Sequence, residues 1–363
     1  MAYYCTGDIW KIGGGSTVLK NLLKHTSHSE NDLHLFVSDY TELPHDIKNN
    51  FTVHSLATPR GRIGLELYDQ FIGPLILAFG QYDRVVFLNS IVPIFYLGRM
   101  DVYFQMRMFY FEELDSFSKK IKNALGKLSI YRSTSVYVAS SDHKNDIVRN
   151  LKVSKSKIKV INLAFDRNDN EISKIPDGNE YFIFISVIRP YKNLHRLVSA
   201  YVQSCEKYGE NFHDLFIIGE KSNYVGMDEY MNDIYVALKQ SCWAHKVRFL
   251  GQKTHSESMS YLKSSKALVF PTLFEGFGLP LLEAMALGVP AIVSNRNSLP
   301  EVGGNTVRFF DPENVDQLAQ ELAFVFEGHY SSSLVESARE RANLFDWTFA
   351  AKAVLSDAEY KVI

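Results

Sequence analysis

The sequence has few cysteines and no excess of charge of either sign. Its three cysteines, Cys5, Cys205 and Cys242, are spread over 363 residues. This spacing fits neither a metal-ligand motif nor a disulfide framework, so we expect the protein to work in a reducing compartment. A formal net charge of −2 argues against binding nucleic acid through general basic attraction. The opening residues, MAYYCTGDIW, lack a basic segment and a long apolar run, which predicts no cleaved signal peptide.

The sequence also lacks long hydrophobic runs, internal repeats and low-complexity tracts. Its most apolar N-terminal segment, residues 71–79, is too short to span a bilayer. No pair of acidic residues stands where a strand would present it to a divalent metal, so we predict no metal site. Hydrophobic residues make up 46% and charged residues 22% of the chain, as in globular proteins. Because 363 residues exceed one ordinary core, we expect two domains.

The N-terminal half, residues 1–165, alternates short apolar runs with helical patterns. A glycine triplet ending in Gly14 and Gly15 follows the first run and precedes a periodic apolar segment. This order predicts a strand, a glycine-rich loop and a helix capped by Ser16 or Thr17. Such a loop lets a ligand approach bare backbone, although a plain flexible turn explains the triplet equally well. Strands of a mainly parallel sheet are predicted at residues 1–5, 33–37, 51–57, 84–88, 102–105, 135–139 and 157–161.

Residues 116–132 form an amphipathic pattern, with an apolar stripe and a basic face of four lysines and one arginine. Two interpretations are open. The helix lies on an anionic membrane surface, or it is a surface helix packed on the sheet with its basic face in water. Helices of the second kind are the more common, so we favour that interpretation.

Residues 166–178 are polar and rich in turn-forming residues, which predicts a linker between two domains. After the linker the alternation restarts, so a second α/β domain is expected at 175–345. A ligand site between two such domains is frequent. Strands are predicted at residues 181–187, 215–218, 247–250, 267–270, 289–294 and 307–310, and helices at residues 193–201, 281–287, 315–326 (capped by Asn314) and 347 to about 360.

The stretch 267–305 organises the second domain. It predicts a buried strand, a glycine-punctuated turn, a helix near Pro280 and a second strand. Proline is tolerated in a first helical turn because its missing N–H would be unpaired there, and Gly288 suits the position that ends the helix. A unit of this kind opens a ligand-sized space at the carboxyl end of its first strand.

Two carboxylates mark this opening, Glu275 in the turn and Glu283 in the helix. The amides of Gly276, Phe277 and Gly278 and the positive end of the helix suit an anion such as a phosphate. Carboxylates accept hydrogen bonds from the hydroxyls of a ribose or a sugar. Together these groups indicate a nucleotide-sugar site. The alternative is an ordinary N-terminal helix acid at 275 and a solvated acid at 283.

A second anion-binding feature follows the predicted strand 181–187. Arg189 and Lys192 stand three residues apart, where this strand ends and a helix begins. Arginine grips a phosphate with two parallel hydrogen bonds, and lysine adds a point charge. Alone, the two cations would be an ordinary basic surface loop. Beside the stretch 267–305 they predict a diphosphate site that needs no metal.

The C-terminal half resembles the family 4 retaining glycosyltransferases, which have the GT-B fold. The E-x7-E pattern from Glu275 to Glu283, with its glycine, proline and leucine residues, is similar to the signature of that family. The resemblance implies an α/β protein with two Rossmann-like domains facing across a cleft. Residues 1–165 and a helix at about 346–363 would bind the acceptor, and residues 175–345 would bind the donor. Further similar segments are residues 160–166, 186–197, 215–219, 247–251, 270–305, 310–312 and 345–347.

The resemblance also implies roles for individual residues. Arg189 and Lys192 would bind the donor diphosphate and stabilise the leaving nucleoside diphosphate. Glu275 would contact the donor sugar, and Glu283 would bind the ribose. The remaining donor contacts would come from Phe277, Gly278, Leu279, Leu299 and Val302, while Gly14 and Gly15 would lie near the diphosphate and the acceptor.

One departure concerns a histidine that many members carry after an N-terminal strand. The corresponding residues 104–108 read FQMRM, so Arg107 is the candidate for a binding role there. The chain is more similar to members that build bacterial O-antigens and capsules than to sucrose or glycogen enzymes.

The function that the resemblance implies is retaining transfer of mannose or a related hexose. A GDP- or UDP-linked sugar would be the donor, and a hydroxyl of a glycan or lipid-linked acceptor would receive it during surface polysaccharide synthesis. Neither a cofactor nor a metal would be needed. We expect a cytoplasmic protein with peripheral contact to the inner membrane face. Two alternatives stay open. The missing histidine leaves room for a non-catalytic nucleotide-sugar-binding subunit, and an enzyme of the same fold that epimerises or hydrolyses a nucleotide sugar is the second.

Overall fold

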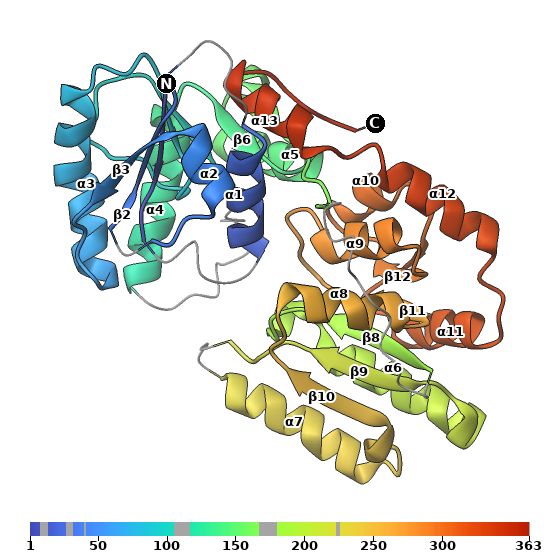
Figure 1. Cartoon of the computed structure of the whole chain (residues 1–363). Helices are drawn as coiled ribbons and strands as arrows, with labels where there is room; N and C mark the ends of the chain where they lie inside the picture. Colours follow the sequence, from blue (N-terminus) through green and yellow to red (C-terminus); the bar gives the residue numbers. More distant parts are fainter. Residues whose placement is uncertain are drawn as a thin grey trace. The chain divides into compact units, whose positions relative to one another are not determined.

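The structure, a computed structural model, describes residues 1–7, 14–26, 32–39, 41–104, 117–166, 180–222 and 226–362. The chain divides into two compact units, unit 1 (Met1–Leu163 with Asp346–Ile363) and unit 2 (Ala164–Phe345). Figure 1 shows that each unit is built from one sheet with helices packed around it. The predicted α/β class is confirmed.

Unit 1 is built on a parallel sheet of seven strands, in the order β3-β2-β1-β4-β5-β6-β7. All neighbouring pairs are parallel. The chain builds the sheet outward from β1 in one direction and from β4 in the other, so its direction reverses between these two strands. The strands are β1 (Ala2–Cys5), β2 (His34–Ser38), β3 (Thr52–Leu56), β4 (Val85–Phe87), β5 (Met100–Tyr103), β6 (Val136–Val138) and β7 (Ile158–Val160).

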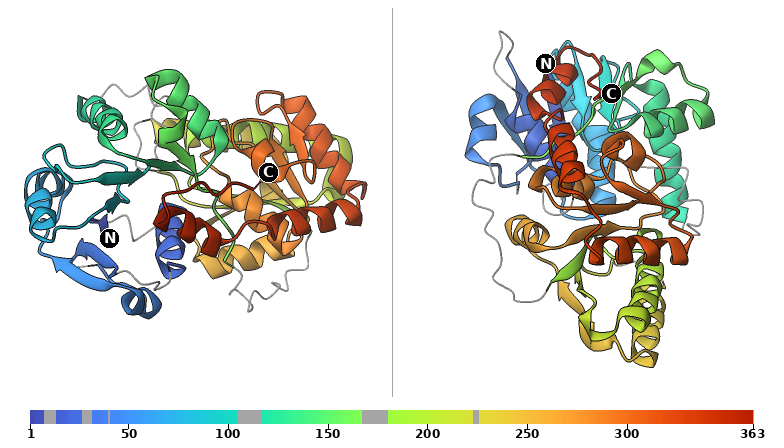
Figure 2. Two further views of the ribbon diagram at one scale, coloured as in Figure 1. Left: turned by 90° about the horizontal axis from the view of Figure 1, so that it is seen from above. Right: turned by 90° about the vertical axis from the view of Figure 1, so that its right-hand side faces the viewer.

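Right-handed crossovers place the helices of unit 1 on both faces of its sheet. The crossovers before the reversal carry α1 and α2 on one face, where α1 also packs against α13 (Figure 2). The crossovers after the reversal carry α3, α4 and α5 on the other face. These helices are α1 (Gly14–Lys24), α2 (His45–Asn50), α3 (Arg62–Phe79), α4 (Phe117–Arg132), α5 (Ser141–Leu151) and α13 (Trp347–Leu355).

The C-terminal segment returns to unit 1 and adds α13 and a final extended stretch. Tyr360 forms a parallel bridge with Ile161, next to β7. The predicted last helix, to about residue 360, is therefore too long, because α13 ends at Leu355. The left-handed backbone of Asp357, with φ 54°, turns the chain out of the helix so that it can join the sheet.

Unit 2 is built on a parallel sheet of six strands, in the order β10-β9-β8-β11-β12-β13. Its neighbours are also parallel throughout. The reversal lies between β8 and β11, which are adjacent in the sheet although β9 and β10 lie between them in the sequence. The strands are β8 (Tyr181–Ile185), β9 (Asp214–Ile218), β10 (Val247–Gly251), β11 (Ala267–Phe270), β12 (Ala291–Ser294) and β13 (Arg308–Phe310).

The helices of unit 2 also cover both faces of its sheet. On one face α6 packs against α7 and α11, and on the other α9 packs against α8, α10 and α12. These helices are α6 (Leu194–Tyr208), α7 (Met227–Gln240), α8 (His255–Ser264), α9 (Leu279–Leu287), α10 (Leu299–Gly303), α11 (Val315–Phe326) and α12 (Ser332–Ala342).

Several predicted boundaries are confirmed by the structure. Pro280 lies in the first turn of α9, and Gly288 ends that helix with φ 69°. Asn314 caps α11, because its side chain accepts a hydrogen bond from the amide of Gln317 at 3.0 Å. These signals are local, so they depend little on the rest of the fold.

Two other predicted boundaries are wrong. Helix α1 begins at Gly14, so Ser16 and Thr17 lie inside the helix and do not cap it. Glycine disfavours helix, but packing of α1 against α2 and α13 overrides that weak preference. The helix predicted at 193–201 begins at Leu194 and continues to Tyr208.

The amphipathic helix predicted at 116–132 is confirmed as α4. Within the part of the chain that the structure describes, none of the helices combines the length and the apolar character needed to cross a bilayer.

Candidate functional site

The candidate site lies where the chain reverses direction in unit 2. Loops that leave two neighbouring strands toward opposite faces of a sheet open a crevice at its carboxyl edge, and ligands bind in such crevices. Strands β8 and β11 are these neighbours. The Arg189 loop (residues 189–193) follows β8, and the Glu275 turn (residues 271–278) follows β11. The two predicted anion-binding segments therefore meet at the reversal.

An ion pair joins the two segments. Lys192 Nζ lies 2.6 Å from Glu275 Oε2, and only 12% and 18% of the two side chains are exposed. The ammonium also lies 5.3 Å and 5.1 Å from the ring centroids of Tyr191 and Phe270, whose faces attract a cation. The other carboxylate oxygen, Glu275 Oε1, accepts a hydrogen bond from the amide of Gly276 at 3.1 Å. Both charged groups are thus held in place at the carboxyl edge of the sheet.

Arg189, on the same loop as Lys192, differs from it in having no carboxylate partner in the described part of the chain. Among the residues that the structure describes, none places a carboxylate within ion-pair distance of its guanidinium, and its Nε is buried without a hydrogen-bond partner. Its Nη1 lies 3.5 Å from the hydroxyl of Tyr191, at the outer limit of a hydrogen bond. A buried charged donor without a partner is costly. An anion bound here would supply the missing acceptor.

Asn193 holds the Arg189 loop against the rest of the site. Its backbone is left-handed, with φ 63°, and its side chain is fully buried. Its Nδ2 donates to the carbonyl oxygens of Pro271 at 3.0 Å and Pro312 at 2.7 Å. The amide of Leu273 also donates to the carbonyl of Tyr191 at 2.8 Å. These bonds fix the distance between Lys192 and the Glu275 turn.

Asn193 is not among the predicted site residues, because an asparagine before a helix normally indicates an N-cap. Here it makes no capping hydrogen bond. The residue type does carry one local signal. Asparagine tolerates left-handed backbone, so an asparagine at this position is compatible with the turn that it makes here.

The Glu275 turn is shaped by a steric requirement at Gly278. Its φ is 102°, and a Cβ placed there would lie 2.5 Å from Leu299 Cδ2. Only glycine therefore permits this close approach. The hydroxyl of Ser298 donates to the carbonyls of Glu275 at 3.2 Å and Phe277 at 3.0 Å. Ser298 is a second residue of the site that the predicted set lacks.

Further charged residues of both signs lie around the two loops. Arg196 Nη1 donates to Asn193 Oδ1 at 2.9 Å. Burial, and then the charge of Arg196, lowers the pKa of His195, so this imidazole is neutral near pH 7. A hydrogen bond from the amide of Glu313 and another from Arg296 lower the pKa of Asp311. The rim of the site therefore carries both signs of charge.

The structure places the other predicted donor residues of unit 2 around α9 and α10. Glu283 lies on α9 and is buried, and Leu279 is the first residue of the same helix. The side chains of Phe277, Leu299 and Val302 are buried, so a ligand would meet these three residues through their backbone. Their roles stay predictions.

The predicted residues of unit 1 are described separately. Gly14 and Gly15 form the start of α1. Arg107 lies outside the described residues. Among the described residues, no three or more histidine, cysteine, aspartate or glutamate side chains are grouped so that they could hold a metal ion.

Comparison with known proteins gives the family. Residues 165–342 match the family described as glycosyl transferases group 1. Unit 2 belongs to the group 1 glycosyl transferases. The matched residues coincide, apart from a few at each end, with unit 2 (Ala164–Phe345). The predicted resemblance of the C-terminal half to a glycosyltransferase family is confirmed.

Curated relatives of the chain include two O-antigen enzymes. The O-antigen chain mannosyltransferase RfbU of Salmonella typhimurium is 26% identical over 241 residues, covering 66% of this chain and 64% of the relative. The O-antigen chain mannosyltransferase B of Escherichia coli is 31% identical over 172 residues, covering 46% and 42%. The matches thus span less than two thirds of either relative's own length.

Solved structures share the fold of the chain. Sucrose-phosphate synthase from Thermosynechococcus elongatus has a TM-score of 0.75 at 16% identity, covering 98% of this chain and 97% of the other. Anabaena HepE, in complex with UDP-glucose, has a TM-score of 0.74 at 14% identity, covering 98% and 99%. The predicted GT-B fold is confirmed.

Proposed function

We propose that the chain transfers a hexose, with mannose as the first candidate, from a nucleoside diphosphate sugar to a hydroxyl of a glycan or lipid-linked acceptor in surface polysaccharide synthesis. The observation that carries the proposal is the meeting of Arg189, Lys192 and Glu275 at the reversal of unit 2. The names of the two O-antigen relatives support mannose. The UDP-glucose in the HepE complex supports a nucleotide-sugar donor.

The donor diphosphate would bind between Arg189 and Lys192. Its oxygens would accept hydrogen bonds from the guanidinium, including the buried Nε that has no partner among the described residues. The Lys192 ammonium would donate a hydrogen bond to the phosphate and loosen its present ion pair with Glu275. Two cations would then neutralise the charge that grows on the leaving diphosphate, which is the largest electrostatic demand of the reaction.

The sugar would lie against Glu275, whose carboxylate would accept hydrogen bonds from sugar hydroxyls once Lys192 contacts the phosphate. Glu283 would bind the ribose. Unit 2 would hold the donor, and unit 1, with Gly14 and Gly15 at the start of α1, would bind the acceptor. The remaining donor contacts would come from the backbone of Phe277, Gly278, Leu279, Leu299 and Val302.

Transfer breaks the bond between the anomeric carbon and the diphosphate oxygen and forms a bond from that carbon to the acceptor oxygen. Retention follows if the acceptor enters on the face that the diphosphate leaves. The acceptor proton then passes to the departing diphosphate, and no protein nucleophile is assigned. In this scheme the protein contributes positioning and charge stabilisation.

Donor binding and transfer test this function separately. Each of GDP-mannose, UDP-glucose, UDP-galactose and dTDP-sugars is added to the full chain, and the correct donor raises the melting temperature, because it binds only the folded state. Transfer of labelled sugar to a membrane lipid extract is then measured. Glu275→Ala should lower transfer by about 10²–10³-fold while leaving the fold intact. Glu336→Ala, at an exposed acid of α12, is the matched control.

Three results would contradict the proposal. Near-normal transfer by Glu275→Ala would remove the role of that carboxylate. Donor binding without turnover would indicate a binding subunit. Release of free sugar or of an epimer without any acceptor would indicate a hydrolase or an epimerase.

The place of the reaction is part of the proposal. A cytoplasmic enzyme in contact with the inner face of the membrane fits the three widely spaced cysteines and a lipid-linked acceptor. Cell fractionation with salt washing would detect such peripheral attachment.

A further inference from the structure

The outer face of α3 is apolar and exposed. Large hydrophobic side chains recur every four residues along it, at Ile63, Leu67, Phe71, Leu75 and Phe79. All five are exposed, and the exposed fraction reaches 76% at Ile63 and 89% at Phe79. Four-residue steps keep these side chains along one slowly turning stripe of the helix. Such a concentration of exposed apolar surface marks an interaction site.

Contacts with the sheet fix which face of α3 points outward. Asp69 Oδ1 accepts a hydrogen bond from the hydroxyl of Tyr4, on β1, at 2.8 Å. A Cβ at Gly73 would lie 2.6 Å from the same hydroxyl, so the helix lies close against the sheet at that point. Leu77 is fully buried on the same side. The apolar stripe lies on the opposite side of the helix. The close packing at Gly73 prevents the helix from rotating to bury it.

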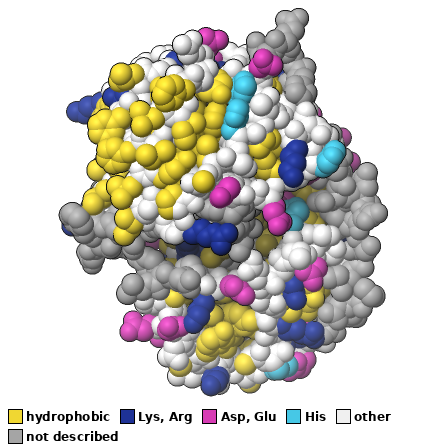
Figure 3. All heavy atoms as spheres, turned by 60° about the vertical axis from the view of Figure 1, so that its left-hand side comes forward, with side chains coloured by type: hydrophobic (Ala, Val, Ile, Leu, Met, Phe, Trp, Pro, Cys, Tyr) yellow, Lys and Arg dark blue, Asp and Glu magenta, His cyan; other side chains and the backbone are white. Residues whose placement is uncertain are grey.

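The apolar surface continues beyond α3 onto the loop at residues 91–98. Phe95 stacks on Phe71 with ring centroids 5.2 Å apart, and Leu97 is 91% exposed. The side chain of Gln70 accepts a hydrogen bond from the amide of Ile94 at 2.9 Å. Helix and loop therefore form one surface, and Figure 3 shows hydrophobic side chains covering a broad area of this side of the molecule.

The same loop connects this surface to the basic helix α4. The amide of Val92 donates to Ser129 Oγ, on α4, at 2.9 Å. Arg132 Nη2, at the end of α4, donates to the carbonyl of Tyr96 at 3.0 Å. Helix α4 also exposes Ile121 and Leu128. We name α3, the loop 91–98 and α4 together the docking surface.

The docking surface is positively charged, in contrast to the whole chain. Among the side chains that the structure describes, its segments carry three cations, Lys120, Lys127 and Arg132, and two acids, Glu66 and Asp69. Asp69 bonds inward to the sheet. All three of these described cations lie on α4, and the sequence of this helix contains no acid. The chain as a whole has a net charge of −2.

We propose that the docking surface binds the surface of an anionic phospholipid bilayer. Apolar side chains would enter the boundary between headgroups and acyl chains, and Lys120, Lys127 and Arg132 would contact the lipid phosphates. A second copy of the chain fits less well, because a two-fold contact would bring like charges together. This surface deepens the membrane contact proposed above by naming the residues that would make it, and it does not depend on the transfer reaction itself.

Flotation of the full chain with vesicles tests the proposal. We expect binding to vesicles of phosphatidylcholine and phosphatidylglycerol, weaker binding to phosphatidylcholine alone, and a decrease with added salt. The apolar variant, Leu67→Gln with Leu75→Gln and Phe79→Gln, should bind both vesicles about tenfold less or weaker still. The charge variant, Lys120→Gln with Lys127→Gln and Arg132→Gln, should lose only the preference for phosphatidylglycerol.

Controls separate the surface from general stickiness and from misfolding. Val236→Gln with Leu344→Gln removes exposed apolar side chains of unit 2 and should leave vesicle binding unchanged. Circular dichroism confirms that each variant is folded. Absence of wild-type binding, or equal binding by the apolar variant, would overturn the proposal. So would a wild-type dimer that the apolar variant converts to a monomer, since a second copy would then cover the surface.

The two proposals fail in different ways. Loss of the docking surface leaves transfer to a water-soluble acceptor unchanged. Failure of the transfer reaction leaves vesicle binding unchanged.

Discussion

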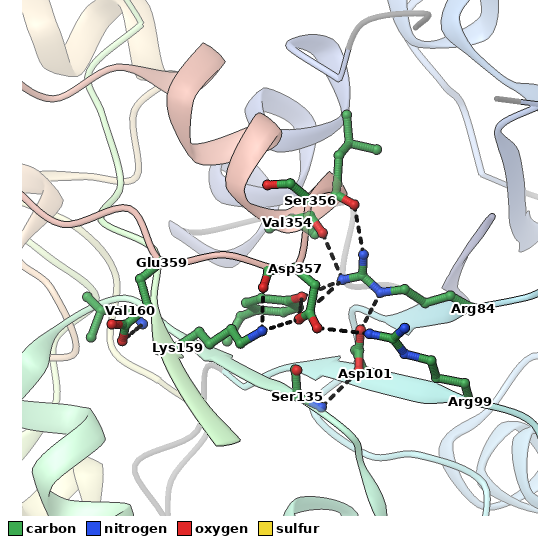
Figure 4. Close-up of polar contacts among 12 residues, drawn as sticks. Arg84, Arg99, Asp101, Ser135, Lys159, Val160, Val354, Ser356, Asp357 and Glu359 are labelled. Atoms are coloured by element: carbon green, nitrogen blue, oxygen red, sulfur yellow. Dashed lines mark hydrogen bonds and ion pairs between the residues drawn. The ribbon is translucent and has the colours of Figure 1, made fainter. Parts of the chain in front are cut away.

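Replacing Arg84 with methionine should loosen the attachment of the C-terminal segment to unit 1 (Figure 4). Only 8% of the Arg84 side chain and none of the Asp101 side chain is exposed, and the two form an ion pair. The guanidinium also donates to the carbonyl oxygens of Val354 at 2.7 Å and Leu355 at 2.9 Å. One side chain therefore joins the sheet to a segment 270 residues away.

The contacts of Arg84 set the size of the effect. Methionine fills a similar volume without charge, so Asp101 would remain a buried carboxylate whose described partner is the amide of Ser135, at 2.8 Å. Removing one partner of a buried ion pair costs about 3–5 kcal/mol, and each unpaired carbonyl adds about 1 kcal/mol. We expect unit 1 to lose about 4 kcal/mol or more, a large share of a typical domain's stability. Arg84→Met with Asp101→Leu should recover part of this loss, because no charge then stays buried.

Hydrogen exchange measured by mass spectrometry is the assay, because two units need not unfold together. Peptides covering residues 347–360 should exchange faster in Arg84→Met than in the wild type. Arg296→Met is the matched control, since Arg296 pairs with Asp311 and Glu313 at the surface and should cost about 0–1 kcal/mol. Equal protection of residues 347–360 in wild type and Arg84→Met would refute the reasoning.

Three further predictions concern single residues. Gly278→Ala should destabilise unit 2 by about 1–3 kcal/mol in thermal unfolding, because its Cβ would meet Leu299, and Leu299→Ala in the same chain should relieve part of the loss. Asn193→Gly keeps the left-handed backbone but removes two hydrogen bonds to carbonyls, so calorimetry should show weaker donor binding, and Asn193→Ala should be less stable still. Burial raises the pKa of Asp69 from 3.8 to about 6, so the folded state holds this proton more tightly and stability falls as pH rises through that window. Asp69→Asn should flatten this slope of melting temperature against pH, and an unchanged slope would contradict the assignment.

Much of the candidate site follows from local signals. Arg189 and Lys192 follow one predicted strand and Glu275 follows another, and both strands exist in the structure. The sequence does not tell which cation pairs with the carboxylate. Lys192 does so across 83 residues, because strand order places the two loops side by side. The role of Asn193 was not predicted either, because the two carbonyl groups that its side chain bonds lie on other loops.

By itself, the sequence determined the α/β class, most strands, the boundaries at Pro280, Gly288 and Asn314, and the family of the C-terminal half. These features depend on neighbouring residues, so short patterns carry them. Only the tertiary structure decided which strands are adjacent, and therefore that Arg84 meets a segment 270 residues away. It also decided which face of α3 points outward. A helix with apolar residues on several sides has no unique inward face in its pattern, and packing against the sheet selects one.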